Sequence, residues 1–101
     1  MDLQKFRSCL SQSEPPKNLS LAVQALWWDA KGDWDKAHAC AQAQDDADGA
    51  WVHAYLHRKE GDKNNAAYWY RCAGKAFPAM PLDEEWEALA NSLTMTEALL
   101  G

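Results

Sequence analysis

Two histidines stand four positions apart near the middle of the chain, His53 and His57. On a helix this spacing places both imidazole rings on one face, where they could hold a zinc ion together with a third ligand. The spacing supplies no third ligand, and His53 is not followed by the glutamate that a hydrolytic zinc helix requires. The favoured interpretation is that both rings are buried or half-buried and hydrogen-bonded. We therefore predict no metal and no cofactor, with His53 and His57 as the candidate ligands if a metal binds.

The nucleophile candidates are the three cysteines, Cys9, Cys40 and Cys72. His38 lies two residues from Cys40, but side chains at i and i+2 do not face each other on a helix. The sequence contains neither a glycine-rich phosphate loop nor a serine nucleophile elbow. We therefore expect a binding protein rather than an enzyme. An odd number of cysteines without paired spacing indicates reduced thiols and a cytoplasmic protein.

The composition is that of one globular domain, with 101 residues of which 48% are hydrophobic and 25% charged. A net charge of -5 without a cluster of lysines and arginines argues against a nucleic-acid partner. No charged-then-apolar leader opens the chain, and no apolar run approaches the roughly 18 residues that would span a bilayer. We expect neither secretion nor a membrane partner.

Prolines, glycines and capping residues divide the chain into about six predicted helices. Gly32 can supply the left-handed conformation that ends a helix, and Asp33 can cap the next one. Gly61 and Asp62 repeat this punctuation further along. Two proline-containing stretches separate the first and the last helix from the others. The predicted helices span residues 2–12, 19–31, 34–44, 49–60 and 62–74, and a last one begins after Pro81.

The four central helices form two similar hairpins. When Ala25 is laid on Ala54, three further identities follow: Gly32 with Gly61, Asp33 with Asp62, and Ala37 with Ala66. Small alanine side chains on facing helices let the two backbones approach closely, and Gly-Asp reverses the chain in a minimal length. Ala66 is therefore predicted to lie at the contact between the two helices of its hairpin.

This pattern resembles the tetratricopeptide-like helical repeat family, in which small residues, a turn glycine and an aromatic recur at fixed offsets. The second copy carries the resemblance at Ala54, Gly61, Ala66, Tyr70 and Ala73. Residues 25–35, Ala-Leu-Trp-Trp-Asp-Ala-Lys-Gly-Asp-Trp-Asp, are also similar to a segment of small uncharacterised bacterial proteins of this type. The resemblance implies an all-α domain of antiparallel hairpins stacked as a short right-handed superhelix. Its parts would be an N-terminal cap helix and linker (1–17), repeat one (18–46), repeat two (47–74), and a linker with a C-terminal cap helix (75–101).

In such arrays the first helices of consecutive hairpins line a concave groove, and this implies a binding surface here. The predicted groove residues are Leu26 and Asp29 from the first copy, and Asp48, Trp51, Tyr55 and Arg58 from the second. Aromatic side chains beside an arginine are typical of binding hot spots. We therefore predict a protein- or peptide-binding module. The alternatives are a structural homodimer that buries the same aromatic patch, and a metal or catalytic site at the two histidines.

Overall fold

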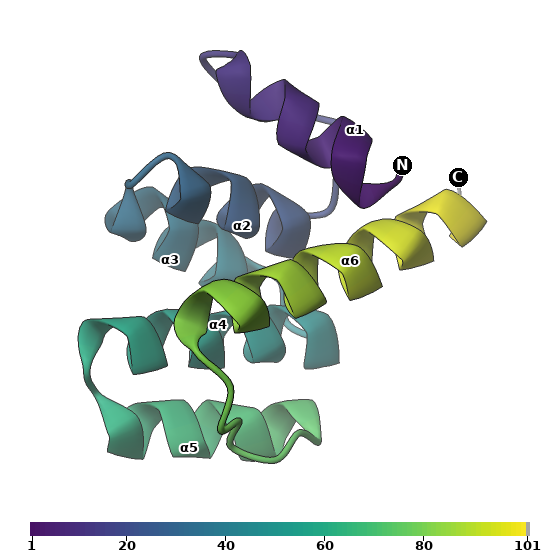
Figure 1. The fold of residues 1–101 in the computed structure, drawn as a ribbon. Helices are drawn as coiled ribbons and strands as arrows, with labels where there is room; N and C mark the ends of the chain where they lie inside the picture. Colours follow the sequence, from purple (N-terminus) through teal and green to yellow (C-terminus); the bar gives the residue numbers. More distant parts are fainter. Residues whose placement is uncertain (101) are drawn as a thin grey trace.

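Six α-helices and one short 3₁₀ turn build the protein, and residues 1–100 contain no strand, which confirms the predicted all-α class. The computed structural model describes residues 1–100, with side chains through Met95, so that Gly101 lies outside the described residues. Figure 1 shows two helical hairpins, a short first helix and a long last helix. The helices are α1 (Leu3–Ser8), α2 (Leu21–Ala30), α3 (Trp34–Ala43), α4 (Ala47–Glu60), α5 (Lys63–Ala73) and α6 (Leu82–Leu100).

The turns inside the two hairpins follow the predicted punctuation. Gly61 ends α4 with a left-handed φ of 95°, and the Asp62 side chain caps α5 by accepting from the Asn65 backbone N–H. Gly32 has a φ of 85° at the equivalent place, and Asp33 caps α3. Glycine adopts the left-handed backbone conformation at almost no energetic cost. The capping carboxylate accepts a hydrogen bond from one of the free N–H groups of the next helix. Each hairpin turn is thus determined by two adjacent residues.

Helix α4 begins two residues earlier than predicted, at Ala47 instead of Gly49, and its cap is Asp46. Gly49 lies in its first turn, where the Gln44 carbonyl approaches closely. A Cβ added at Gly49 would come within 1.8 Å of that oxygen. The loop between the two hairpins therefore packs directly on the start of α4, and only glycine leaves the necessary space.

The helices of each hairpin meet at the predicted alanines. Ala54 and Ala66 are fully buried in one apolar cluster together with Tyr70. Ala25 and Ala37 are fully buried in the main apolar cluster of the domain. Small side chains at these positions allow close helix packing. The position predicted for Ala66 is confirmed.

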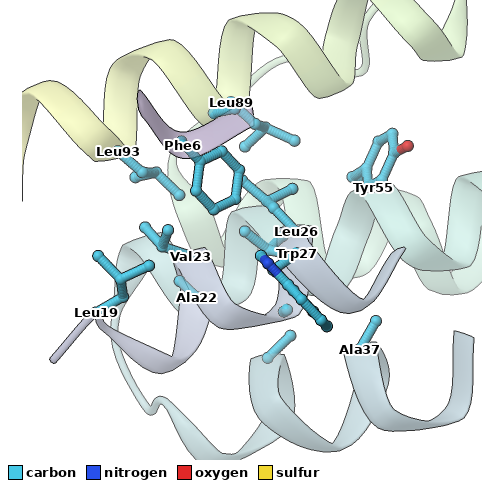
Figure 2. Close-up of a cluster of buried hydrophobic side chains, with 14 of the residues drawn as sticks. Phe6, Leu19, Ala22, Val23, Leu26, Trp27, Ala37, Tyr55, Leu89 and Leu93 are labelled. Carbon is cyan, nitrogen blue, oxygen red and sulfur yellow. The ribbon is translucent and has the colours of Figure 1, made fainter. Parts of the chain in front are cut away.

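The last helix does not close the far end of the stack, as we had expected of a cap. Helix α6 instead lies across α2 and α4 and reaches α1 (Figure 1). Leu89 and Leu93 point from α6 into the main cluster, beside Phe6, Val23 and Leu26 (Figure 2). Burying such a leucine stabilises the fold by about 1.5–3 kcal/mol. The apolar stripe of α6 is buried against α2 and α4, which explains why α6 lies across the hairpins.

A polar contact fixes the position of α6 along that face. The Trp86 indole Nε1–H donates to the carbonyl oxygen of Leu26 at 3.1 Å.

Within residues 1–100, no helix is long and apolar enough to cross a membrane. A right-handed superhelical course of the hairpins stays a prediction.

Candidate functional site

The predicted groove face is covered rather than open. Leu26 and Asp29 are buried, and Tyr55 is only 2% exposed. Leu89 of α6 joins Leu26 and Tyr55 in one apolar cluster (Figure 2). The prediction that these groove residues are free for a partner is therefore wrong, because α6 of the same chain occupies the face.

The polar groove residues in this region form hydrogen bonds within the protein. The Asp29 carboxylate accepts from the Tyr55 hydroxyl at 2.9 Å and from the Lys59 amino group at 2.8 Å. Burial, followed by the charge of Asp29, raises the pKa of Tyr55, so the hydroxyl keeps its proton and acts as a donor. These three side chains connect α2 to α4.

Arg58, predicted to anchor a partner, instead anchors α6. Its guanidinium donates to the Glu85 carboxylate at 2.7 Å and to the Met80 carbonyl at 2.6 Å. The Tyr70 hydroxyl donates to the other oxygen of Glu85. Glu85 is 3% exposed, and the side chain of Arg58 is 16% exposed. The ion pair is therefore largely withdrawn from water and joins α4, α5 and α6.

Trp51 packs against the main apolar cluster that contains Tyr55, and also against the cluster of Ala54, Ala66 and Tyr70. Trp51 is half-buried, and the Lys75 amino group stands 4.2 Å from its ring centroid. Burial and the nearby Asp46 raise the pKa of Asp48, and Lys75 partly opposes this. The Tyr55 ring lies inside the domain and is not available to a second copy, and a homodimer through the other aromatic side chains stays a prediction.

One part of the groove face remains open as a cavity of about 740 Å³, bounded by α1, α2, α4 and the first turns of α6. Asp29 and Tyr55 line it together with Lys59, and Trp86 provides an aromatic wall. The Arg7 guanidinium carbon stands 5.6 Å from the Trp86 ring centroid. Predicted groove residues reach open space in this cavity.

Acidic side chains outnumber basic ones around this cavity. Asp83, Glu84 and Glu87 add to Asp29, against Arg7 and Lys59. Asp29 is matched by Lys59, and Glu87 by Arg7 at 3.4 Å. In the part of the chain with described side chains, Asp83 and Glu84 make no ion pair. The rim of the cavity therefore carries an excess of negative charge.

A second candidate site lies between the two hairpins, where three histidines meet. His53 and His57 of α4 are joined by His38 of α3, whose Nε2 lies 2.9 Å from the Nε2 of His53. The ring centroid of His57 lies 4.7 Å from that of His53 and 5.1 Å from that of His38. One candidate ligand atom from each residue lies within 4.8 Å of the others. The structure thus supplies the third histidine that the spacing alone did not place.

Neighbouring side chains hold the three rings. Trp34 stacks on His38 at a centroid distance of 4.9 Å, and Trp69 stacks on His53 at 4.1 Å. The Trp34 indole is itself fixed, because its Nε1–H donates to the carbonyl oxygen of Leu56 at 2.9 Å. Burial, followed by the charges of His38 and His57, lowers the pKa of His53 to about 4. The pKa of His38 is also lowered, mainly by burial. Both rings are therefore neutral at pH 7.

His57 has polar partners on both ring nitrogens. Its Nδ1 lies 2.5 Å from a carboxylate oxygen of Glu60, and its Nε2 lies 3.2 Å from the side-chain nitrogen of Asn65. A second cavity of about 450 Å³ reaches His53 from the loop between the hairpins, past Trp69 and Cys72. The histidine cluster is thus packed on one side and accessible on the other.

The sequence places His38 only beside Cys40, and no pattern in it singles out Glu60, Asn65 or Glu85 as members of a site. His38 directly follows the buried contact residue Ala37, and in the structure its ring meets His53 and His57 of the next hairpin. Glu85 is one of several acids at the start of α6, where negative charge favours a helix start, and no local pattern pairs it with Arg58. Comparison with protein-family models, with curated proteins and with solved structures finds no match to this chain.

Proposed function

We propose that the protein is a tetratricopeptide-like binding module that takes up a basic segment of another cytoplasmic protein in the cavity beside α6. The repeated Gly-Asp turns and buried alanine pairs support the family assignment. The free thiols of Cys9, Cys40 and Cys72 agree with a reducing compartment. The cavity volume of about 740 Å³ lies in the range of roughly 300–1,000 Å³ found for ligand sites, which is enough for a few side chains.

The observation that carries the proposal is the position of Arg7. This side chain of α1 places a guanidinium over the Trp86 ring and pairs with Glu87 at 3.4 Å. A cation over a tryptophan face is attracted by the ring quadrupole. Because the Arg7 side chain is 51% exposed, its ion pair is weak and can be exchanged. Arg7 therefore occupies the place that a partner's arginine or lysine would take.

The charge around the cavity favours a basic partner over an acidic one. Asp83 and Glu84 stand at its rim and form no ion pair with any described side chain, and the whole chain carries a net charge of -5. Complementary charge raises the association rate and selects against partners of the same sign. An acidic segment would meet both carboxylates directly.

Binding can be measured by fluorescence anisotropy with a labelled Gly-Arg-Leu-Arg-Gly peptide, compared with Gly-Glu-Leu-Glu-Gly. Replacing both acids (Asp83→Asn with Glu84→Gln) should weaken binding of the basic peptide. The matched control changes the same charge elsewhere, with Asp35→Asn and Glu14→Gln. Arg7→Ala should strengthen binding, because it empties the cavity of its own cation. Lys5→Ala, on the same helix, controls for the lost charge.

The proposal fails if the basic peptide does not bind, or if the acidic peptide binds equally well. It also fails if the two pairs of acid variants weaken binding equally, since the attraction would then be a property of net charge alone. A shift of the Trp86 indole signal in the nuclear magnetic resonance spectrum locates the peptide, because this N–H is fixed on the Leu26 carbonyl.

A further inference from the structure

We propose that His38, His53 and His57 form a binding site for a divalent transition metal ion, with Zn²⁺ as the ion that the ligand set favours. Neutral imidazole is a preferred ligand of zinc, and three protein ligands are the usual number in sites that keep one position open. The proposal does not depend on peptide binding, because the histidines line none of the cavity beside α6.

The distances between the histidines suit one shared ion. With Zn–N bonds of 2.0–2.1 Å, two ligand nitrogens of a tetrahedral ion lie roughly 3.3 Å apart. The Nε2 atoms of His38 and His53 are 2.9 Å apart, and the candidate atom of His57 lies within 4.8 Å of both. Small rotations of the imidazole rings bring the three nitrogens to the spacing that zinc needs.

Glu60 prepares His57 for such a role. A carboxylate oxygen of Glu60 lies 2.5 Å from His57 Nδ1 and can accept a proton from that nitrogen, and in this tautomer Nε2 carries the lone pair that a metal ion needs. A metal-bound histidine almost always donates its other N–H to a carboxylate or carbonyl in this way, which orients the ring and raises its basicity. The Asn65 side-chain nitrogen lies 3.2 Å from Nε2 and can donate a hydrogen bond to the same lone pair.

The surroundings keep His38 and His53 ready to bind. Trp34 and Trp69 stack on the two rings and restrict their orientation, which reduces the entropy that binding would cost. The arrangement is therefore organised in advance for coordination.

Access and an open position complete the site. The cavity of about 450 Å³ leads from the surface to His53, which gives an ion a route to the cluster. Three histidines leave one position of a tetrahedral ion for water or a small anion. The site thus suits an ion with an exchangeable ligand better than a closed structural zinc.

The test is isothermal titration calorimetry of chelator-treated protein with zinc chloride at pH 7.5, together with the visible absorption of the Co²⁺-loaded protein. We expect one ion per chain and the intense absorption of tetrahedral cobalt. His38→Ala should weaken zinc binding at least tenfold, and Glu60→Gln by roughly 10–100-fold. Cys72→Ser is the matched control, because its thiol lines the same access cavity, and it should change the affinity less than twofold.

Far-UV circular dichroism shows whether each variant is folded, and His38→Asn, which nearly preserves the side-chain shape, replaces His38→Ala if that variant unfolds. The proposal is overturned if zinc does not bind in tenfold excess, or if His38→Ala and His38→Asn bind as tightly as the wild type. It is also overturned if Cys72→Ser loses the ion. Loss in Asp62→Asn alone would place the ion at the outer group formed by His57, Glu60 and Asp62, and would overturn the assignment to the three histidines.

Discussion

The ion pair between Glu85 and Arg58 offers the sharpest test of how α6 is held on the hairpins. Replacing Glu85 with alanine leaves a guanidinium that is 16% exposed without its carboxylate, and it removes the acceptor of the Tyr70 hydroxyl. Removing one partner of a buried pair costs about 3–5 kcal/mol, because the other charge stays buried. A domain of this size has a total stability of about 5–15 kcal/mol, so Glu85→Ala should remove a large part of it.

The chain contains a matched control two residues further along the same helix. Glu87 pairs with Arg7, but these side chains are 59% and 51% exposed. An exposed pair contributes about 0–1 kcal/mol, since water screens both charges. Glutamate and alanine are both strong helix formers, so the difference between Glu85→Ala and Glu87→Ala isolates the burial of the pair.

The assay is urea unfolding at pH 7.5, followed by tryptophan fluorescence and by far-UV circular dichroism. Coincident curves from the two probes justify a two-state treatment. Glu85→Ala should lower the midpoint by roughly 2 M urea, and Glu87→Ala should leave it nearly unchanged. Equal losses in the two variants, or a loss below about 1 kcal/mol in Glu85→Ala, would refute the view that this pair holds α6 in place.

The same unfolding assay tests three further predictions. Burial and the neighbouring His38 and His57 lower the pKa of His53 to about 4 in the folded protein, below the usual value of about 6.5. Between these two values the unfolded chain binds a proton that the folded protein does not, so the free energy of unfolding decreases as the pH is lowered. Between pH 7.5 and 5, with chelator present, the wild type should lose roughly 2 kcal/mol that His53→Gln does not lose. Ala66→Leu should cost about 1–3 kcal/mol through overpacking, and an unchanged stability would contradict the observed contact. Gly49→Ala should cost at least about 2 kcal/mol, because the new methyl group collides with the backbone before α4, and a neutral result would show that this loop yields easily.

The hairpins could be predicted because residues close together in the sequence determine where their helices begin and end. Gly61 and Asp62 decide the end of one helix and the start of the next, and the alanine pairs repeat at the same offset in both copies. The start of α4 was harder to predict. Asp46 and Asp48 are both good caps, and the choice between them depends on how the preceding loop packs against Gly49. A local pattern therefore locates the helix but not its first residue.

The course of α6 and the two candidate sites depend on contacts between distant parts of the chain. The Arg58 contact to Glu85 joins residues 27 positions apart, and the contact of His38 to His53 joins residues on different hairpins. Periodicity shows that α6 has an apolar stripe, but it does not show which face receives that stripe. The groove is implied only by the resemblance to helical repeat arrays, and most of this face is covered by α6, whose direction no repeat determines.

The contact between Trp86 and Leu26 also bears on the order in which the protein folds on the ribosome. The two residues are 60 positions apart, and at roughly 5–20 residues per second their synthesis is separated by about 3–12 s. During this time the hairpins can form, but the apolar face that later receives Leu89 remains in water. The nascent chain therefore exposes this apolar face until α6 emerges, and the closure of α6 is the step that buries it.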